Sequence, residues 1–486
     1  MEENKKQLSD LIFIVLNLII EQDIGPTYAA RLLYVYTSLI RLGIKIVKPQ
    51  TVLGSKFKIK EDIINKDCRF CRTRKYYQYY KYYKSFRNNY IEYIAIQSLK
   101  LIRKMFPDSK LIKDFRRDHK IKNVFKKTNR KFRQFLSDKS LLREINSELK
   151  DFYSYLDKDG WKKGDKQMKL TNDYYIDPDY PIPVEKLNDP ESWCLLKGQK
   201  QLGPYWGDVR DILNKKDTRK LESYLDQKYK EIDAVKENKR VLELSLQLTD
   251  QNKMSAEFWQ GIPGSVSPAG FWTMFLYRYF KANDKPNSVQ ADYYYKLTCA
   301  EFQASVTCWK VKYQHLQLRP IQCIRLNYQD EKFDYYFGNN VKGDMWLPFQ
   351  EPRMYSPPFP DFISGHSTFS SAGAYIMNKL IGKKIDDNIK ISTQELSMCA
   401  PIFKDQPYEV FNLNEFFVNP NTSLIQENVP AQRFSFKHSS WDEMAWEAGM
   451  SRLYGGIHIH PANDEGMEAG RKIGILIWKK LKSKKN

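Results

Sequence analysis

Segments with helical spacing of apolar residues dominate this chain and exclude a β-rich fold as its main architecture. From residue 257 onward, apolar and small residues recur at helical intervals over long windows, whereas the strict alternation typical of half-buried strands is scarce. The sequence therefore predicts a mainly α-helical protein. The clearest helical windows are residues 268–282, 287–318, 367–382, 441–454 and 466–482.

Two more helices are predicted near the N-terminus, at residues 6–22 and 27–43, with a Gly-Pro turn between them. The first contains the apolar run LIFIVLNLII at residues 11–20, which follows two lysines and so also suits a signal peptide. No small-residue cleavage site follows it, and a second apolar helix comes at once, which favours a buried core helix. The run is shorter than the roughly 18 residues of a membrane span, so we predict a soluble protein.

The charge of the chain suits anionic ligands. Its 79 Lys and Arg residues against 58 Asp and Glu residues give a formal net charge of +21. Between residues 50 and 170, lysines alternate with tyrosines, and such a segment could bind single-stranded nucleic acid by stacking and charge. A solvated helical insertion explains the same pattern, and a general enrichment in Lys, Asn, Ile, Tyr and Phe explains the charge. We favour the insertion and do not expect nucleic acid to be the main partner.

The sequence FPDFISGHSTF at residues 359–369 combines a proline-rich loop with the predicted start of a helix. Free backbone N–H groups and the helix dipole make a helix N-terminus a ready site for an anion. Ser364 adds a hydroxyl, Gly365 allows close approach of a ligand, and His366 adds a titratable ring.

Two further segments bring cations. Lys312 and Arg319 are seven residues apart, which on one continuous helix places them on the same face, with Pro320 at its end. In SRLYGGIHIHP, a Gly-Gly pair can break the helix and let Arg452 and His458 address one site. So much positive charge suits a tetrahedral oxyanion such as phosphate or vanadate.

Together these segments resemble the three-part signature of the vanadium-dependent haloperoxidases, which related acid and lipid phosphatases share. The signature is formed by Lys312 with six residues to Arg319, by Ser364-Gly365-His366, and by Arg452 with five residues to His458. Residues 25–39, 202–209 and 256–272 are also similar to segments of the soluble haloperoxidases. The likeness covers most of the chain outside residues 50–170.

The resemblance implies a fold of two four-helix bundles in one globular unit, like that of the haloperoxidases and acid phosphatases, as a monomer or homodimer. Within a single domain spanning residues 1–486, we expect four parts. These are core helices at 1–50, a Lys- and Tyr-rich helical insertion at 51–170, a loop and helical connection at 171–250, and a catalytic helical bundle at 251–482.

The resemblance also implies a function. Vanadate would be the cofactor, and the enzyme would oxidise halide with hydrogen peroxide to hypohalous acid and halogenate small organic substrates. The implied roles are covalent attachment of vanadate to His458, binding of its oxygens by Lys312, Arg319, Arg452, Ser364 and Gly365, and acid–base catalysis by His366.

Trp309 and Phe359 match the aromatic pair of fungal-type chloroperoxidases, which favours oxidation of bromide and chloride. The same two rings could simply wall the pocket.

Three features leave alternatives open. His460 could compete with His458 as the ligand, because the Asp that commonly follows the ligand histidine is displaced here to Asp464. Gly261 stands where many relatives carry Asp, so a partner for an arginine would have to come from elsewhere. Phosphate and vanadate share charge and shape, so the same pocket would also suit a phosphatase that forms a phospho-histidine at His458.

Overall fold

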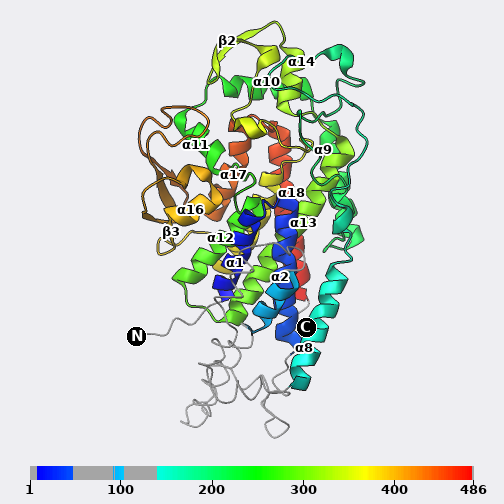
Figure 1. Ribbon diagram of the computed structural model, residues 1–486, viewed down its shortest axis with the longest axis vertical. Helices are drawn as coiled ribbons and strands as arrows, with labels where there is room; N and C mark the ends of the chain where they lie inside the picture. Colours follow the sequence, from blue (N-terminus) through cyan, green and yellow to red (C-terminus); the bar gives the residue numbers. More distant parts are fainter. Residues whose placement is uncertain (1–7, 47–90, 92, 103–138, 484–486) are drawn as a thin grey trace.

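The computed structural model describes residues 8–46, 91, 93–102 and 139–483, and these are mainly helical, as predicted (Figure 1). The principal helices are α1 (Leu8–Glu21), α2 (Pro26–Ile46), α8 (Lys139–Leu156), α9 (Lys215–Lys230), α10 (Ala234–Ser245), α11 (Asp250–Phe258), α12 (Ser267–Ala282), α13 (Asn287–His315), α14 (Pro320–Asn327), α15 (Gly365–Ile381), α16 (Thr393–Cys399), α17 (Trp441–Tyr454) and α18 (His460–Ser483).

The N-terminal apolar run forms α1, a core helix. Leu11, Ile12, Val15, Leu16 and Ile19 are all buried, and α1 packs against α12 and α13. Helix α2 contacts α12, α13 and α8, so both N-terminal helices belong to the same core as the C-terminal half (Figure 1).

Helix α13 runs through the centre of the molecule and contacts α2, α12, α15 and α18 (Figure 1). It is buried on nearly every side, which explains why its sequence lacks a polar face. Helices α15, α17 and α18 pack against one another beside it, and the prediction of helical bundles packed in one globule is confirmed.

Glycines set the close approach of α18 to α15. Gly466, Gly470 and Gly474 recur every fourth residue, on one face of α18. A Cβ on Gly466 would lie 2.9 Å from the Ser364 carbonyl oxygen, and one on Gly470 would collide with the backbone of α15. This contact holds the first residues of both helices together, and the Ser364 N–H donates to the Ala462 carbonyl at 2.8 Å.

Two small antiparallel sheets decorate the helices and were not predicted. Strands β1 (Lys332–Tyr335) and β2 (Gly338–Lys342) form a hairpin. The second sheet has the order β3-β4-β5-β6, with β3 (Lys390–Ser392), β4 (Val410–Asn412), β5 (Glu415–Val418) and β6 (Phe434–Lys437). Each strand has only three to five residues, too few for alternation to stand out in a sequence.

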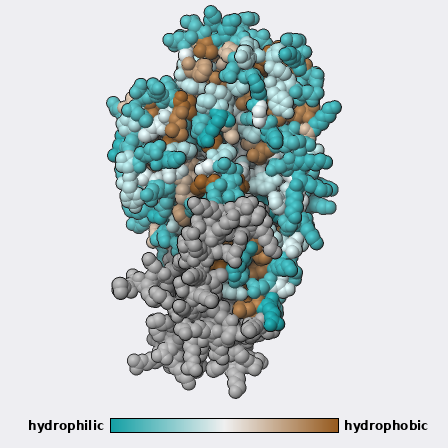
Figure 2. All heavy atoms as spheres, in the orientation of Figure 1, coloured by the Kyte–Doolittle hydropathy of each residue, from teal (hydrophilic) through white to brown (hydrophobic). Residues whose placement is uncertain are grey.

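Most of the expected insertion at 51–170, including the Lys- and Tyr-rich segment, lies outside the described residues. Within the described ranges, every helix is too short or too polar to cross a bilayer. Hydrophilic residues predominate on the face of these ranges seen in Figure 2, with hydrophobic residues in small separate areas.

Candidate active site

Ser364 is the N-cap of α15. Its Oγ accepts a hydrogen bond from the Ser367 N–H, and the Ser367 hydroxyl lies 2.8 Å from the Ser364 Oγ and 2.7 Å from Asn463 Oδ1. Gly365 and His366 follow in the first turn of the helix, where backbone N–H groups lack partners within the helix. The predicted turn into a helix N-terminus is therefore present.

Lys312 and Arg319 do not lie on one helix, contrary to the sequence prediction. Helix α13 ends at His315, because Leu316 takes a left-handed conformation with φ 48°. Arg319 is the residue before α14, and Pro320 begins that helix instead of ending the previous one.

Both cations nevertheless face the loop before Ser364. The Lys312 Nζ donates to the carbonyl oxygens of Pro360 and Asp361 at 2.8 and 2.7 Å, and the Arg319 Nε donates to that of Phe359 at 2.8 Å. The Lys312 Nζ and the Arg319 Cζ each lie 5.0 Å from the centre of the Phe359 ring. The aromatic ring therefore helps to hold the two cations.

His458 lies at the centre of this arrangement, in the loop between α17 and α18. Its Nδ1 hydrogen bonds to the carboxylate of Asp361, and its Nε2 lies 3.2 Å from the Arg319 Nη1. The carboxylate is an acceptor, so Nδ1 carries the proton and Nε2 keeps its lone pair. His458 thus presents the ring nitrogen that can bind a metal or attack phosphorus.

Asp361 was missed in the sequence. It is fully buried, and its other oxygen accepts the Ile459 N–H at 3.3 Å, so one carboxylate orients the whole segment that carries His458. The only signal was a charged residue placed among prolines and aromatics three positions before Ser364.

His460 points elsewhere. It is half-buried, its Nδ1 lies 4.0 Å from a carboxylate oxygen of Glu237, and it does not line the pocket described below. The geometry therefore separates the two histidines, because of the two only His458 contacts Arg319 and lines the pocket.

Arg452 and His366 face the loop at Gly261. An Arg452 N–H donates to the Trp259 carbonyl, so a backbone oxygen stands in for the carboxylate partner that Gly261 cannot supply. Gly261 has φ +60°, and a Cβ there would lie 2.8 Å from the His366 Nε2. A side chain at this position would therefore press on the histidine ring.

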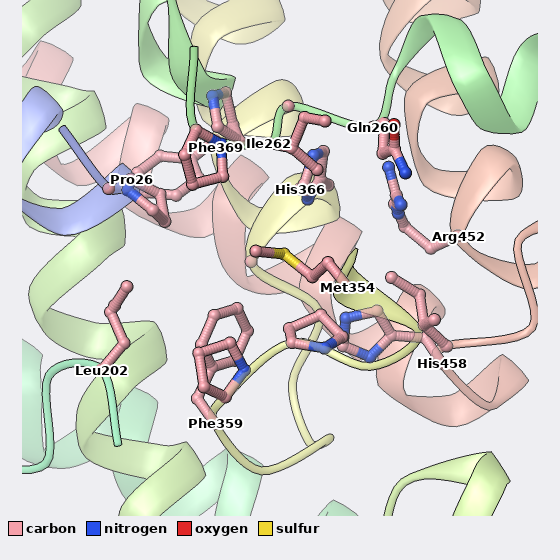
Figure 3. A pocket seen from close by; sticks show the side chains of 18 of the residues that line it. Pro26, Leu202, Gln260, Ile262, Met354, Phe359, His366, Phe369, Arg452 and His458 are labelled. Atoms are coloured by element: carbon pink, nitrogen blue, oxygen red, sulfur yellow. The ribbon is translucent and has the colours of Figure 1, made fainter. Parts of the chain in front are cut away.

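These groups surround a pocket with a cavity of about 80 Å³. Gly365, His366, Arg452, His458, Trp309 and Phe359 line it, whereas Lys312, Arg319 and Ser364 are not among its lining residues. Figure 3 shows His366, Arg452 and His458 on the polar side, with Phe359 and Leu202 across from them. The centres of the Trp309 and Phe359 rings are 4.9 Å apart.

The site holds more buried positive than negative charge. Lys312, Arg319 and Arg452 are each no more than 1% exposed, and none of them forms an ion pair in the part of the chain that the structure describes. The Arg319 Nη2, the Arg452 Nε and the His366 Nε2 are buried without a hydrogen-bond partner there. Unpaired buried guanidinium donors are costly, so the two arginines call for an anion.

Burial shifts the pKa of every one of these groups. It lowers the pKa of Lys312 to about 7, with a further contribution from Arg319, and that of Arg452 to about 9. Burial, followed by nearby cations, holds the pKa of His366 and of His458 well below the usual range, although the carbonyls of Trp259 and Gln260 oppose the fall at His366. Both imidazoles are therefore neutral at pH 7.

We expect oxyanion affinity to fall as pH rises above about 7. A bound anion favours protonated Lys312 and raises its pKa, so binding takes up a proton. The Kd for molybdate, whose charge is constant in this range, should rise by up to about tenfold per pH unit for each linked proton.

Calorimetric titration at several pH values, in buffers of different ionisation enthalpy, measures this Kd and the proton uptake together. An affinity that is independent of pH, with no proton taken up, would contradict the linkage.

Comparisons with known proteins agree with this fold. Residues 292–486 match the family model of the VCPO second helical-bundle domain. A bacterial vanadium-dependent iodoperoxidase superposes with a TM-score of 0.62 at 18% identity, covering 99% of this chain and 98% of that chain. The holo form of a bacterial vanadium-dependent chloroperoxidase superposes with a TM-score of 0.58 at 14% identity, covering 95% of this chain and 93% of that chain. An apo-type bacterial vanadium-dependent chloroperoxidase superposes with a TM-score of 0.60 at 14% identity, covering 95% of this chain and 95% of that chain. A search of curated proteins finds no match.

Proposed function

We propose that the protein is a vanadate-dependent haloperoxidase, on the premise that residues 292–486 match the family model of the VCPO second helical-bundle domain. It would oxidise halide with hydrogen peroxide to hypohalous acid, which then halogenates small organic substrates. The observation that carries the proposal is the set of three buried cations near His458, with unpartnered donors on both arginines.

The residues present fit vanadate. His458 would ligate the metal through its Nε2, because Asp361 holds the proton on Nδ1. Oxygens of vanadate would accept from the unpartnered donors on Arg319 and Arg452. Lys312 donates two of its ammonium protons to backbone carbonyls, and its third proton would also hold an oxygen. Ser364 and the Gly365 N–H at the helix N-terminus would complete this set. When bound, vanadate supplies a Lewis acid that polarises peroxide.

His366 would move the proton. Its unpartnered Nε2 belongs to a ring that lines the pocket, and its depressed pKa keeps that ring neutral and able to accept a proton from a bound peroxide. The donors are fixed before a reactant arrives, so little reorganisation is needed.

The Trp309–Phe359 pair supports bromide and chloride as substrates. Both rings line the pocket wall, and Lys312 and Arg319 behind Phe359 favour a negative ion near it.

A phosphatase is the alternative, and the Asp361–His458 pair favours it specifically. A carboxylate raises the nucleophilicity of the histidine it orients, which suits formation of a phospho-histidine. The apolar wall formed by Ile24, Pro26, Leu202, Ile262 and Pro358 offers a phosphate ester little polar contact.

Bromination of monochlorodimedone tests the proposal. Protein stripped of metal and phosphate is assayed with hydrogen peroxide and bromide, without and with orthovanadate, and then with chloride. Vanadate-dependent bromination is the expected result. Hydrolysis of p-nitrophenyl phosphate without any halogenation would overturn the proposal in favour of the phosphatase.

Asp361→Asn should lower vanadate-dependent turnover about 10- to 100-fold, the usual cost of losing an outer partner of a metal ligand. The amide can turn its NH₂ toward the His458 Nδ1 and so place the ring proton on Nε2. Turnover, its pH profile and vanadate affinity measure the effect. The matched control is Asp464→Asn, since Asp464 is exposed and, among the described residues, bonds only to the neighbouring Asn463. Equal losses in both variants would contradict the role of Asp361.

A further inference from the structure

Met354 places a thioether inside the pocket. It ends the short turn Pro352–Met354, is half-buried, and lines the same cavity as His366, Arg452 and His458. In Figure 3 its sulfur lies between His366 and His458. No other sulfur-bearing side chain lines this cavity in the part of the chain that the structure describes.

The rest of the wall resists oxidation. Most of the lining is aliphatic, proline, glycine or phenylalanine, as at Ile24, Pro263 and Phe369. Trp309 is only 1% exposed, and its indole N–H donates to the Leu202 carbonyl at 3.0 Å. The Met354 sulfur is therefore the most oxidisable atom that faces the reaction.

We propose that Met354 is an oxidation site at which the enzyme modifies itself, an inference that rests on the proposed haloperoxidase function. The oxidant is the hypohalous acid released in the pocket. An S–O bond forms at the thioether, the oxygen–halogen bond breaks, and a proton and halide leave. Sulfur loses two electrons and the halogen gains them, so the products are methionine sulfoxide and the hydrogen halide.

The modification limits turnover. A sulfoxide converts a flexible apolar side chain into a polar one, here in the cavity that His366 and His458 also line. Activity therefore declines with the number of turnovers and not with time in peroxide alone.

Met345 provides a matched comparison. It also ends a three-residue turn, Gly343–Met345, and is half-buried, but it does not line the cavity. Trypsin cleaves after Lys342 and Arg353, so the two methionines fall on separate peptides. Met377, on the same peptide as Met354, is fully buried.

The experiment follows sulfoxide on both peptides by mass spectrometry while bromination is measured in the same sample. The arms are peroxide alone, peroxide with bromide, and peroxide with bromide and orthovanadate. We expect Met354 to be oxidised several-fold faster than Met345, only in the last arm. Met354→Leu, which conserves volume, should keep a larger fraction of its own initial rate after equal turnovers.

Each outcome of this experiment either supports or overturns the oxidation site at Met354. Bromination with Met354 unmodified, or with Met345 oxidised equally fast, overturns the oxidation site and leaves the haloperoxidase intact. Absence of bromination in the vanadate arm overturns both. Oxidation of Met354 by peroxide alone, at the same rate as in the vanadate arm, also overturns the proposal, because the oxidant would not come from turnover.

Discussion

His458→Ala should reduce vanadate-dependent bromination to the level seen without enzyme. The variant removes the ring nitrogen that Asp361 orients, and with it the covalent attachment proposed for vanadate. The loss of vanadate affinity should exceed the about 10- to 100-fold cost of losing an outer partner. Steady-state bromination and calorimetric titration of vanadate measure the two effects.

The control is His460→Ala, which should stay close to wild type, because His460 lies outside the pocket and faces Glu237. Near-full activity of His458→Ala, with loss of activity in His460→Ala, would assign the ligand to His460 instead.

His366→Ala should lower turnover by about 10²- to 10⁴-fold, the usual contribution of a positioned acid–base group. Its Nε2 is buried without a partner, and its pKa is held low, so it can take a proton but contributes no charge to anion binding. Most of the affinity for vanadate should therefore remain. The loss of turnover should appear in kcat, measured with saturating vanadate.

A His366→Ala protein that stays folded but no longer binds vanadate or molybdate would contradict the acid–base role. Circular dichroism and the melting temperature establish the fold, and titration of the anion separates the two roles. Arg452→Ala is the matched comparison, since removal of a buried cation should weaken anion binding directly.

The sequence was sufficient for the helices because their apolar residues repeat over many turns. The windows at 287–318 and 441–454 correspond to α13 and α17, and the run at 11–20 lies in α1, buried as predicted. The separation of Arg452 from His458 by a broken helix was also foreseen, because a Gly-Gly pair permits it; α17 ends at Tyr454 and Gly456 has φ 64°.

Where local rules did not apply, the predictions failed. Leu316 takes a left-handed conformation that usually calls for glycine. The sequence therefore has no glycine to signal the end of α13. The strands of the small sheets are too short to show the alternation of apolar and polar residues that predicts a strand.

The partnership of Asp361 with His458 spans 97 positions, and nothing local in a sequence links a loop carboxylate to a histidine so far away. Gly261 illustrates the same limit. Its departure from relatives looked like a lost partner, whereas in the structure the glycine makes room for the His366 ring and a carbonyl serves Arg452.

A crystal structure of the protein soaked with orthovanadate tests the central claim most directly. We predict density for a vanadium atom bonded to the Nε2 of His458, with oxygens accepting from Arg319 and Arg452. Density attached to His460, or an empty pocket at saturating vanadate, would contradict this account.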